Sequence, residues 1–453
     1  MAGVRTSIHG EWSSKLAFVL AATGSAVGLG NIWKFPYVAG QNGGGAFVLI
    51  YVACVAIIGV PIMMAEVMLG RRGRQSPINT MRTLAAEEGR SPRWGLLGWM
   101  GVLAGFLILS FYSVIAGWAL AYVFRTAAGL FDGATADFTA QVFSNLISDP
   151  EKLIAWHTLF LIMTMVVVAR GVAAGLETAV RFLMPGLFVL LLLLVGYAMA
   201  EGQFVHGLQF LFAPDFGKVT PEVILMAMGQ AFFSLSLGMG AIMIYGSYLP
   251  HDASIARTSI AVASADTLVA LIAGLAIFPV VFEYGLQPNA GPGLIFQTLP
   301  IAFGQMPGGA FFGTLFFILL VFAAWTSAIS LVEPAVAWLV ENRGHTRVYA
   351  AVVCGMLTWF VGLGTVFSFN LWSDYRLFGR TFFDLLDYLT SNIMLPIGGL
   401  LIAIFAGWLM KERSVKEELK MDDSLGYRLW RFLVRYITPV GVGLVFLNVI
   451  EVI

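Results

Sequence analysis

Long apolar stretches alternate with short polar links along almost the whole chain. A helix needs about 20 predominantly apolar residues to cross the hydrocarbon core of a membrane. On this criterion the pattern predicts about eleven transmembrane helices, with links that carry most of the charge. We expect the helices at residues 13–37, 44–70, 95–126, 153–170, 176–200, 222–248, 255–284, 310–341, 347–368, 382–410 and 429–452.

Two of these apolar stretches are interrupted near their middle by glycine and small residues. The first interruption covers residues 24–31 and the second covers residues 230–240. A spanning helix satisfies its own backbone groups, and an unsatisfied group in lipid costs several kcal/mol. Close helix packing through small residues would explain a single interruption. Paired interruptions in the two halves of a chain indicate the substrate and ion site of a transporter.

The two interrupted helices divide the chain into similar halves, at about residues 13–200 and 222–410. Each half holds five predicted spans and begins with the interrupted one. Because five is odd, the second half enters the membrane from the opposite side, which is the inverted topology of many secondary transporters. The span at about 429–452 lies outside the repeat, and we treat residues 1–453 as a single transmembrane domain.

Composition agrees with an all-α polytopic membrane protein. The chain is 59% hydrophobic and 11% charged, whereas soluble domains are about 25% charged. The formal net charge is zero, which argues against a nucleic-acid partner because that needs a basic surface. Basic residues crowd the link after the second span, at Arg71, Arg72 and Arg74. The positive-inside rule therefore predicts a cytoplasmic N-terminus. We expect a multi-pass protein of the cell inner (plasma) membrane.

Polar side chains inside the apolar stretches are the candidates for binding an ion or a substrate. Asp266 lies among apolar residues, where an ionisable group costs roughly 2.5–3.5 kcal/mol. A hard cation such as Na⁺ suits this carboxylate; the alternative is a protonated carboxyl bonded to a neighbouring helix. Thr326 and Ser327 either face the first interruption or bond back to their own helix. Glu66 is a second buried acid, which either contacts substrate or satisfies unwound N–H groups.

The link at 285–309 is long and uncharged and contains proline and glycine. It either folds back toward the pore as a lid or is a plain surface loop.

Three strings around the interruptions carry a family resemblance. Residues 24–37 read GSAVGLGNIWKFPY, residues 41–47 read QNGGGAF, and residues 232–238 read FFSLSLG. They resemble the neurotransmitter:sodium symporter family, which has the leucine-transporter fold: a five-plus-five inverted repeat with broken first and sixth helices. The chain looks most like the bacterial subset that carries hydrophobic and aromatic amino acids.

This resemblance implies two sodium sites. One would use the Ala26 carbonyl, Asn31, Ser234 and Asp266, with the substrate carboxylate as a further ligand. The other would use the carbonyls of Gly24, Val27 and Ala323 and the hydroxyls of Thr326 and Ser327.

The resemblance also implies a substrate pocket between the two interruptions. Tyr112 would bond the substrate carboxylate, and Phe233 would close over the substrate from outside. Met239 stands where a phenylalanine is common, and a flexible methionine makes a bulky substrate plausible. The implied lining is Ser25, Ala26, Leu29, Gly30, Ile108, Tyr112, Phe233, Ser234, Ser236, Met239, Ser327 and Leu331.

Two gates complete what the family resemblance implies. Lys34 and Asp387 would form the outer gate. At the inner gate Glu341 is the acidic partner, and His9 stands where the family usually has arginine. Either Arg5 replaces that arginine from further back in the chain, or His9 pairs with Glu341 only when protonated.

The predicted function is sodium-coupled symport of tryptophan, tyrosine, phenylalanine or leucine by alternating access. Asp266 stands where the family often has asparagine, so its carboxylate supplies negative charge beside the cation, and we expect no chloride requirement. Tyr51, Gln230 and Ser234 nevertheless resemble chloride ligands.

Three alternative functions remain. A proton-coupled transporter of the same fold would use Asp266 or Glu66. A channel would need a symmetric pore or a charge ring. An enzyme would need a catalytic constellation, and the histidines are scattered, so no enzyme is expected. The predicted partners are an amino acid and membrane lipid, with the oligomeric state left open.

Overall fold

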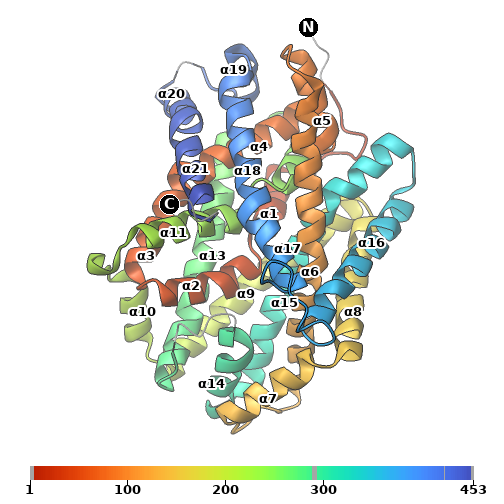
Figure 1. Cartoon of the computed structure of the whole chain (residues 1–453). Helices are drawn as coiled ribbons and strands as arrows, with labels where there is room; N and C mark the ends of the chain where they lie inside the picture. The colour runs from red at the N-terminus through yellow and green to blue at the C-terminus, as the bar shows by residue number, and fades with distance from the viewer. Residues whose placement is uncertain (1–4, 288–292, 423, 450–453) are drawn as a thin grey trace.

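The computed structural model describes residues 5–287, 293–422 and 424–449. Within these ranges the chain is built from helices, with one isolated bridge between Leu377 and Arg380 and no strand. Figure 1 shows long helices running between two ends of the molecule. Helix α5 (Pro77–Glu87) and the N-terminus lie at one end, and α7 (Ala136–Ile147) and α14 (Leu299–Gln305) lie at the other.

The apolar stretches form the predicted membrane helices. Nine continuous segments of the described chain are long and apolar enough to span a membrane, and a bent pair makes a tenth. The nine are Gly45–Gly73, Pro92–Ala127, Pro150–Ala169, Val172–Glu201, Ile255–Glu283, Gly309–Arg343, Arg347–Ser368, Phe382–Leu409 and Leu425–Asn448. The remaining predicted span, 222–248, is divided between α11 (Pro221–Ser234) and α12 (Ala241–Ser247).

Both predicted interruptions are present. Helix α1 (Lys15–Ala26) and the segment Gly30–Gln41, which ends in α2 (Phe35–Gln41), are bent by 53° relative to each other. Helices α11 and α12 are separated by turns. The broken first and sixth helices of the leucine-transporter fold are therefore confirmed, although each half-helix is too short to cross a membrane alone.

Other helices place these breaks in the centre of the bundle. Long helices α6 (Gly95–Ala127) and α15 (Gly309–Arg343) pack along each other more extensively than any other pair. Glycines on α6 permit this closeness: a Cβ on Gly105 would lie 2.8 Å from the Leu331 carbonyl oxygen. Helix α1 packs against α15 and against α13 (Ile255–Glu283). The breaks are therefore enclosed by protein and shielded from lipid.

Helix starts follow ordinary capping chemistry. Ser14, Thr220 and Ser254 each accept a backbone N–H at the start of α1, α11 and α13, and Pro221 occupies the first turn of α11. Such caps satisfy backbone donors that the helix cannot pair itself.

The long link at 285–309 folds back over the bundle in its described part. Gly293 and Gln297 line a large cavity that also reaches Phe233, and the Phe296 ring packs against Trp118 at 5.8 Å between centroids. Residues 288–292 lie outside the described ranges. The lid alternative for this link therefore fits the structure better than a plain surface loop.

Candidate substrate and ion site

The first break frees backbone carbonyls at the centre of the molecule. Helix α1 ends at Ala26, because Val27 is extended, with φ −69° and ψ 106°. The Ser327 hydroxyl on α15 lies 3.4, 3.2 and 3.1 Å from the carbonyl oxygens of Gly24, Ser25 and Val27. Because a hydroxyl has a single proton, at most one of these carbonyls is fully satisfied. The others remain available to a cation.

The second break ends α11 in a turn that normally needs glycine. Leu237 donates its N–H to the Phe232 carbonyl at 3.4 Å, and Ser236 donates its N–H to the Phe233 carbonyl at 3.2 Å. This is the Schellman pattern, whose left-handed residue is usually glycine. Here it is Ser236, with φ 54°. The Ser236 hydroxyl donates to the Ser25 carbonyl at 2.9 Å and so joins the two breaks.

Glu66 satisfies the second break from α4 (Val60–Gly73). Its Oε1 accepts the Gly238 backbone N–H at 2.6 Å. Gly238 has φ 83°, and an added Cβ would lie 2.5 Å from the Leu395 carbonyl oxygen, so only glycine fits this close crossing. Of the two expectations for Glu66, the structure shows the one in which the carboxylate pairs with unwound backbone.

The residues of the first predicted sodium site meet around Asp266. Asn31 donates to Asp266 Oδ1 at 2.7 Å and accepts the Gly28 N–H at 3.1 Å. The Ser234 hydroxyl lies 3.0 Å from the Tyr51 hydroxyl, beside the same carboxyl group. Asp266 is fully buried, and its Oδ2 has no hydrogen-bond partner among the described residues. A buried, unpaired carboxylate oxygen among other oxygens fits a hard cation.

The residues of the second predicted sodium site also come together. Thr326 bonds back to the carbonyls of Phe322 and Ala323, both at 3.1 Å, as expected for a hydroxyl within a helix. Its neighbour Ser327 faces the first break instead. A Cβ added to Gly24 would lie 3.2 Å from the Thr326 Cβ. The carbonyls of Gly24, Val27 and Ala323 and the hydroxyls of Thr326 and Ser327 therefore lie close together as one cluster of oxygens.

A small cavity of about 30 Å³ lies between the two breaks. It contains every predicted pocket residue except Ser25 and Ser234, and it adds Gly28. The Ser25 hydroxyl instead donates to Ser330 at 2.8 Å, and Ser234 turns to Tyr51. The lining is Ala26, Gly28, Leu29, Gly30, Ile108, Tyr112, Phe233, Ser236, Met239, Ser327 and Leu331. This volume holds about two water molecules, so a larger ligand requires these walls to move apart.

Polar groups converge at one side of the cavity. The break frees the Leu29 N–H, which donates to the Tyr112 hydroxyl at 3.1 Å. A carboxylate placed here would accept from both groups. The rest of the wall, Ile108, Met239 and Leu331, is apolar. The arrangement suits a small molecule with an anionic end and an apolar end.

A second cavity of about 610 Å³ continues from the site toward the α7 and α14 end of the bundle. It shares Leu29, Tyr112 and Phe233 with the small cavity. Lys34 and Asp387 both line it, but within the described chain no ion pair joins them. The Lys34 ammonium instead lies 4.2 Å from the centre of the Phe233 ring. The proposed outer gate is thus unpaired in this conformation.

The residues predicted for the inner gate meet at the opposite end of the bundle. His9 Nε2 lies 3.2 Å from Glu341 Oε1, and both side chains are nearly buried. Glu341 also accepts the Ser76 N–H at 2.7 Å and the Asn79 amide at 2.8 Å. Arg5 pairs with Glu87. Of the two alternatives for the partner of Glu341, the structure therefore shows His9.

Sequence reasoning placed Gly28 in the first break but not in the pocket lining, and it missed Ser330 and a buried ion pair. Glu333 is fully buried on α15, accepts the Tyr248 hydroxyl at 2.7 Å and pairs with Arg347. A signal for Glu333 was present, because it is an acid inside an apolar stretch, as Asp266 is. Gly28 lies within the glycine-rich interruption, but the string does not show which of its glycines faces the cavity. Ser330 gave no signal, because serine is common at ordinary helix contacts.

Two broken helices around an oxygen-rich cavity define a membrane transporter of the broken-helix type. Comparison with known proteins specifies the family. The model of the sodium:neurotransmitter symporter family matches residues 9–135 and 136–453. The chain therefore belongs to this family, as the sequence strings predicted.

The relatives cover almost the whole chain. The chain is 42% identical to the sodium-dependent transporter YhdH of Bacillus subtilis over 445 residues, which cover 98% of each protein. It is 34% identical to a sodium-dependent transporter of Haemophilus influenzae, with 96% of this chain and 97% of that protein covered. The crystal structure of MhsT in complex with L-phenylalanine has 43% identity and a TM-score of 0.89, covering 97% of this chain and 99% of MhsT. The protein is therefore a sodium-dependent membrane transporter and not an enzyme.

Gly28 offers a direct test of the cavity. A Cβ at this position would lie 2.5 Å from Ser327 Oγ and 2.8 Å from the Tyr112 hydroxyl oxygen. Overpacking of this kind costs about 1–3 kcal/mol, so we expect Gly28→Ala to weaken substrate binding roughly tenfold or more. Gly196→Ala is the control, because its Cβ would meet nothing within 4 Å. Equilibrium binding of labelled substrate measures both variants; normal binding by a folded Gly28→Ala protein would contradict the assignment.

Proposed function

We propose that this protein is a sodium-coupled symporter of hydrophobic and aromatic L-amino acids that works by alternating access. Tryptophan, tyrosine, phenylalanine and leucine are the proposed substrates. The observation that carries the proposal is the cavity between the two breaks, which has freed backbone groups on one side and an apolar wall on the other. The complex of MhsT with L-phenylalanine, at 43% identity, supports the same substrate class.

In this proposal the substrate carboxylate binds the Leu29 N–H and the Tyr112 hydroxyl, which now bond each other. The side chain of the substrate lies against Ile108, Met239 and Leu331. Met239 adapts its shape by rotating its thioether chain, which widens the cavity for an aromatic ring. Phe233 covers the substrate, because its ring lies between the small cavity and the larger one.

Two sodium ions accompany the substrate. The first binds the Ala26 carbonyl, Asn31, Ser234 and the free Asp266 Oδ2, together with the substrate carboxylate. The second binds the oxygen cluster of Gly24, Val27, Ala323, Thr326 and Ser327. Because each set uses carbonyls from the first break, ion binding fixes the same backbone that binds the substrate. This shared backbone couples the sodium gradient to substrate uptake.

Alternating access uses a gate at each end. We assign the α7 and α14 end to the outside and the N-terminal end to the cytoplasm of the cell inner membrane, as the basic residues indicate. The open outer cavity and the His9–Glu341 contact then describe an outward-facing conformation. Closure would bring Lys34 to Asp387. The two halves, 13–200 and 222–410, supply one broken helix each within a single domain, and span 429–452 lies beside them.

Asp266 makes chloride unnecessary in this proposal. Two Na⁺ and a zwitterion bring two positive charges into a low-dielectric site, where uncompensated charge is costly. A fixed carboxylate beside the first ion offsets one of them. The sodium-dependent relatives favour sodium over the proton-coupled alternative, and Glu66 is already bonded to the Gly238 N–H.

Uptake of radiolabelled phenylalanine into proteoliposomes tests the function. We expect uptake to require a sodium gradient and to continue when gluconate replaces chloride. Unlabelled tryptophan, tyrosine and leucine should compete, and glutamate or lysine should not. Uptake that ignores sodium, or that ignores all hydrophobic amino acids, would overturn the proposal.

Asp266→Asn tests charge compensation. The substitution keeps the shape and removes the negative charge, so sodium binding should need an added anion. We expect uptake without chloride to fall about tenfold, equivalent to about 1.4 kcal/mol, and to recover in part when chloride is restored. The parent protein measured in the same two buffers is the control. Equal uptake by the variant with and without chloride, at the parental level, would contradict this account.

His9→Arg tests the inner gate. Arginine carries a permanent charge and presents several donors in a rigid fork, so it should hold Glu341 more firmly than the single His9 Nε2 contact at 3.2 Å does. We expect the inner gate to open less often and phenylalanine uptake to be about fivefold slower, equivalent to about 1 kcal/mol.

His345→Arg is the matched control, because His345 is exposed and its replacement should leave uptake unchanged. Uptake by a folded His9→Arg protein that equals uptake by the parent would exclude His9 from the inner gate.

A further inference from the structure

The link between α16 (Arg347–Ser368) and α17 (Phe382–Asp387) carries exposed apolar side chains. It joins two membrane spans at their outer ends in the proposed orientation, because one span ends at Ser368 and the next begins at Phe382. Figure 1 shows the link as a blue loop at the end of α16. A link that faces water is normally polar. Here the side chains that are between 41% and 86% exposed include Leu371, Trp372, Tyr375, Leu377 and Phe378.

The base of this link is fixed against the bundle. The Trp372 N–H donates to the Phe367 carbonyl at 2.7 Å, and the centroids of the two rings lie 5.2 Å apart. The Asn370 amide donates to the Ile147 carbonyl at 2.9 Å, which ties the link to the end of α7. The residues beyond this base are therefore held by a fixed support.

The tip of the link is a two-residue hairpin that contains an unfavourable residue. Leu377 and Arg380 exchange both backbone hydrogen bonds, at 2.9 and 3.1 Å. Between them, Phe378 and Gly379 have φ of 53° and 74°, and positive φ at both central positions defines a type I′ turn. Asparagine, aspartate and glycine are preferred in such turns, whereas a bulky residue with positive φ is strained.

Contacts within the described chain do little to offset the strain at Phe378. Its exposed fraction is 86%, the highest among the large hydrophobic residues that the structure describes. A Cβ added to the neighbouring Gly379 would meet nothing within 4 Å, so the tip is open on this side as well. Residues that stay strained in a native structure are typical of functional positions. The partner that stabilises the Phe378 ring therefore lies outside the chain.

We propose that Phe378 and its apolar neighbours insert into the outer leaflet of the membrane, at the boundary between headgroups and acyl chains. Tyrosine and tryptophan are enriched at this level, and the link carries Tyr375 and Trp372. The Arg376 side chain is 53% exposed, and its guanidinium lies 3.9 Å from Asp384, too far for a hydrogen bond. Its donors are therefore available to a lipid phosphate, which suits arginine geometry. The partner is a phospholipid, which supplies an acyl chain to the ring and a phosphate to the arginine.

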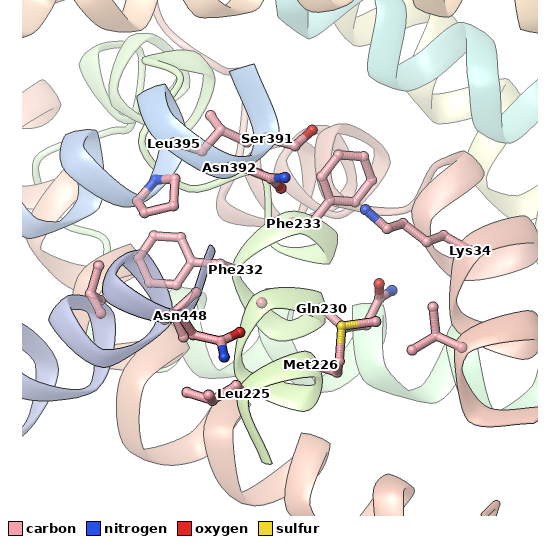
Figure 2. A pocket seen from close by; sticks show the side chains of 15 residues that line it. Lys34, Leu225, Met226, Gln230, Phe232, Phe233, Ser391, Asn392, Leu395 and Asn448 are labelled. Carbon is pink, nitrogen blue, oxygen red and sulfur yellow. The ribbon is translucent and has the colours of Figure 1, made fainter. Parts of the chain in front are cut away.

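This anchor also steadies the outer gate, a step that rests on the proposed function. Arg376 in the link and Asp387 in α17 both line the outer cavity. Asp387 accepts the Ser391 hydroxyl at 2.8 Å. Figure 2 shows Ser391 beside the Phe233 ring and the Lys34 ammonium. A fixed hairpin therefore holds α17 where Lys34 can meet Asp387 when the gate closes.

Fluorescence quenching tests the contact with lipid without any need for transport. Bimane is attached to the Phe378→Cys variant of the full-length protein in phosphatidylcholine nanodiscs. The parent protein measures background labelling, because its cysteines, Cys54 and Cys354, are buried. One quencher is a nitroxide near the headgroup end of the lipid acyl chain, and the other is iodide in the water.

Two further labelled positions calibrate the quenching. Leu192→Cys is the lipid control, because Leu192 is 61% exposed within the span Val172–Glu201. Asp137→Cys is the water control, because Asp137 is exposed on α7 at the outer end of the bundle (Figure 1). We expect the lipid nitroxide to quench the label at position 378 at least about half as strongly as the label at position 192. Weak quenching by the lipid nitroxide would overturn the proposal, whether iodide reaches the label or cysteine cross-linking shows that a second copy covers it.

Phe378→Asn separates the role of the ring from folding. Asparagine suits the turn, and in detergent an exposed ring has similar surroundings in the folded and the unfolded protein. The melting temperature of this variant in detergent should therefore equal or exceed that of the parent. Phe378→Trp is the matched control, because it keeps an interfacial ring. We expect the maximum rate of sodium-driven phenylalanine uptake to fall about threefold in Phe378→Asn and to be retained in Phe378→Trp.

A lower melting temperature of Phe378→Asn would place the partner of the ring within the chain and overturn the proposal. Strong lipid quenching with unchanged uptake by Phe378→Asn would overturn the gate step alone. If the protein carries no amino acid at all, the quenching result still decides whether the anchor exists, so the two failures are distinguishable.

Discussion

The structure depends on one constraint: backbone groups that are freed inside a membrane must find partners. Both breaks meet it with side chains from other helices. Glu66 accepts the Gly238 N–H, Tyr112 accepts the Leu29 N–H, and Ser327 reaches the carbonyls of the first break. These partners come from α4, α6 and α15, so the breaks are stable only inside the complete bundle.

The partners leave some oxygens unsatisfied, and these oxygens make up the proposed ion sites. The single proton of Ser327 cannot serve three carbonyls, and Asp266 Oδ2 has no partner within the described chain. If every oxygen at the breaks had a hydrogen-bond partner, none would be available to bind a cation. Partial satisfaction leaves places for cations, whose binding completes the polar network. An oxygen that has a hydrogen-bond partner stabilises the ion-free protein, whereas an oxygen without one is available to bind an ion. The same oxygen atoms cannot serve both purposes fully.

The fold and most of the site could be predicted from the sequence, because the relevant signals are local. Apolar length predicted the spans, and glycine-rich strings predicted both breaks. Side-chain direction could not be predicted: Ser25 lies in the break but turns to Ser330. Lys34 and Asp387 line one cavity without an ion pair between them in the described chain, and the sequence alone does not show which conformation of a transporter is present. The sequence could not show that Glu341 contacts His9 and not Arg5. Arg5 pairs with Glu87, which is distant in the sequence, and this leaves His9 as the partner of Glu341.

Ser236 shows how strictly a single position can be constrained. Its left-handed backbone would suit glycine, but glycine lacks the hydroxyl that holds the Ser25 carbonyl. Threonine keeps a hydroxyl, yet its branched Cβ resists positive φ, and alanine fails on both grounds. Asparagine tolerates the backbone, but its longer side chain carries its polar atoms further from the backbone than the serine hydroxyl does. Serine is thus a compromise between the left-handed backbone and the hydrogen bond to Ser25. Very few other residues can meet both requirements at this position.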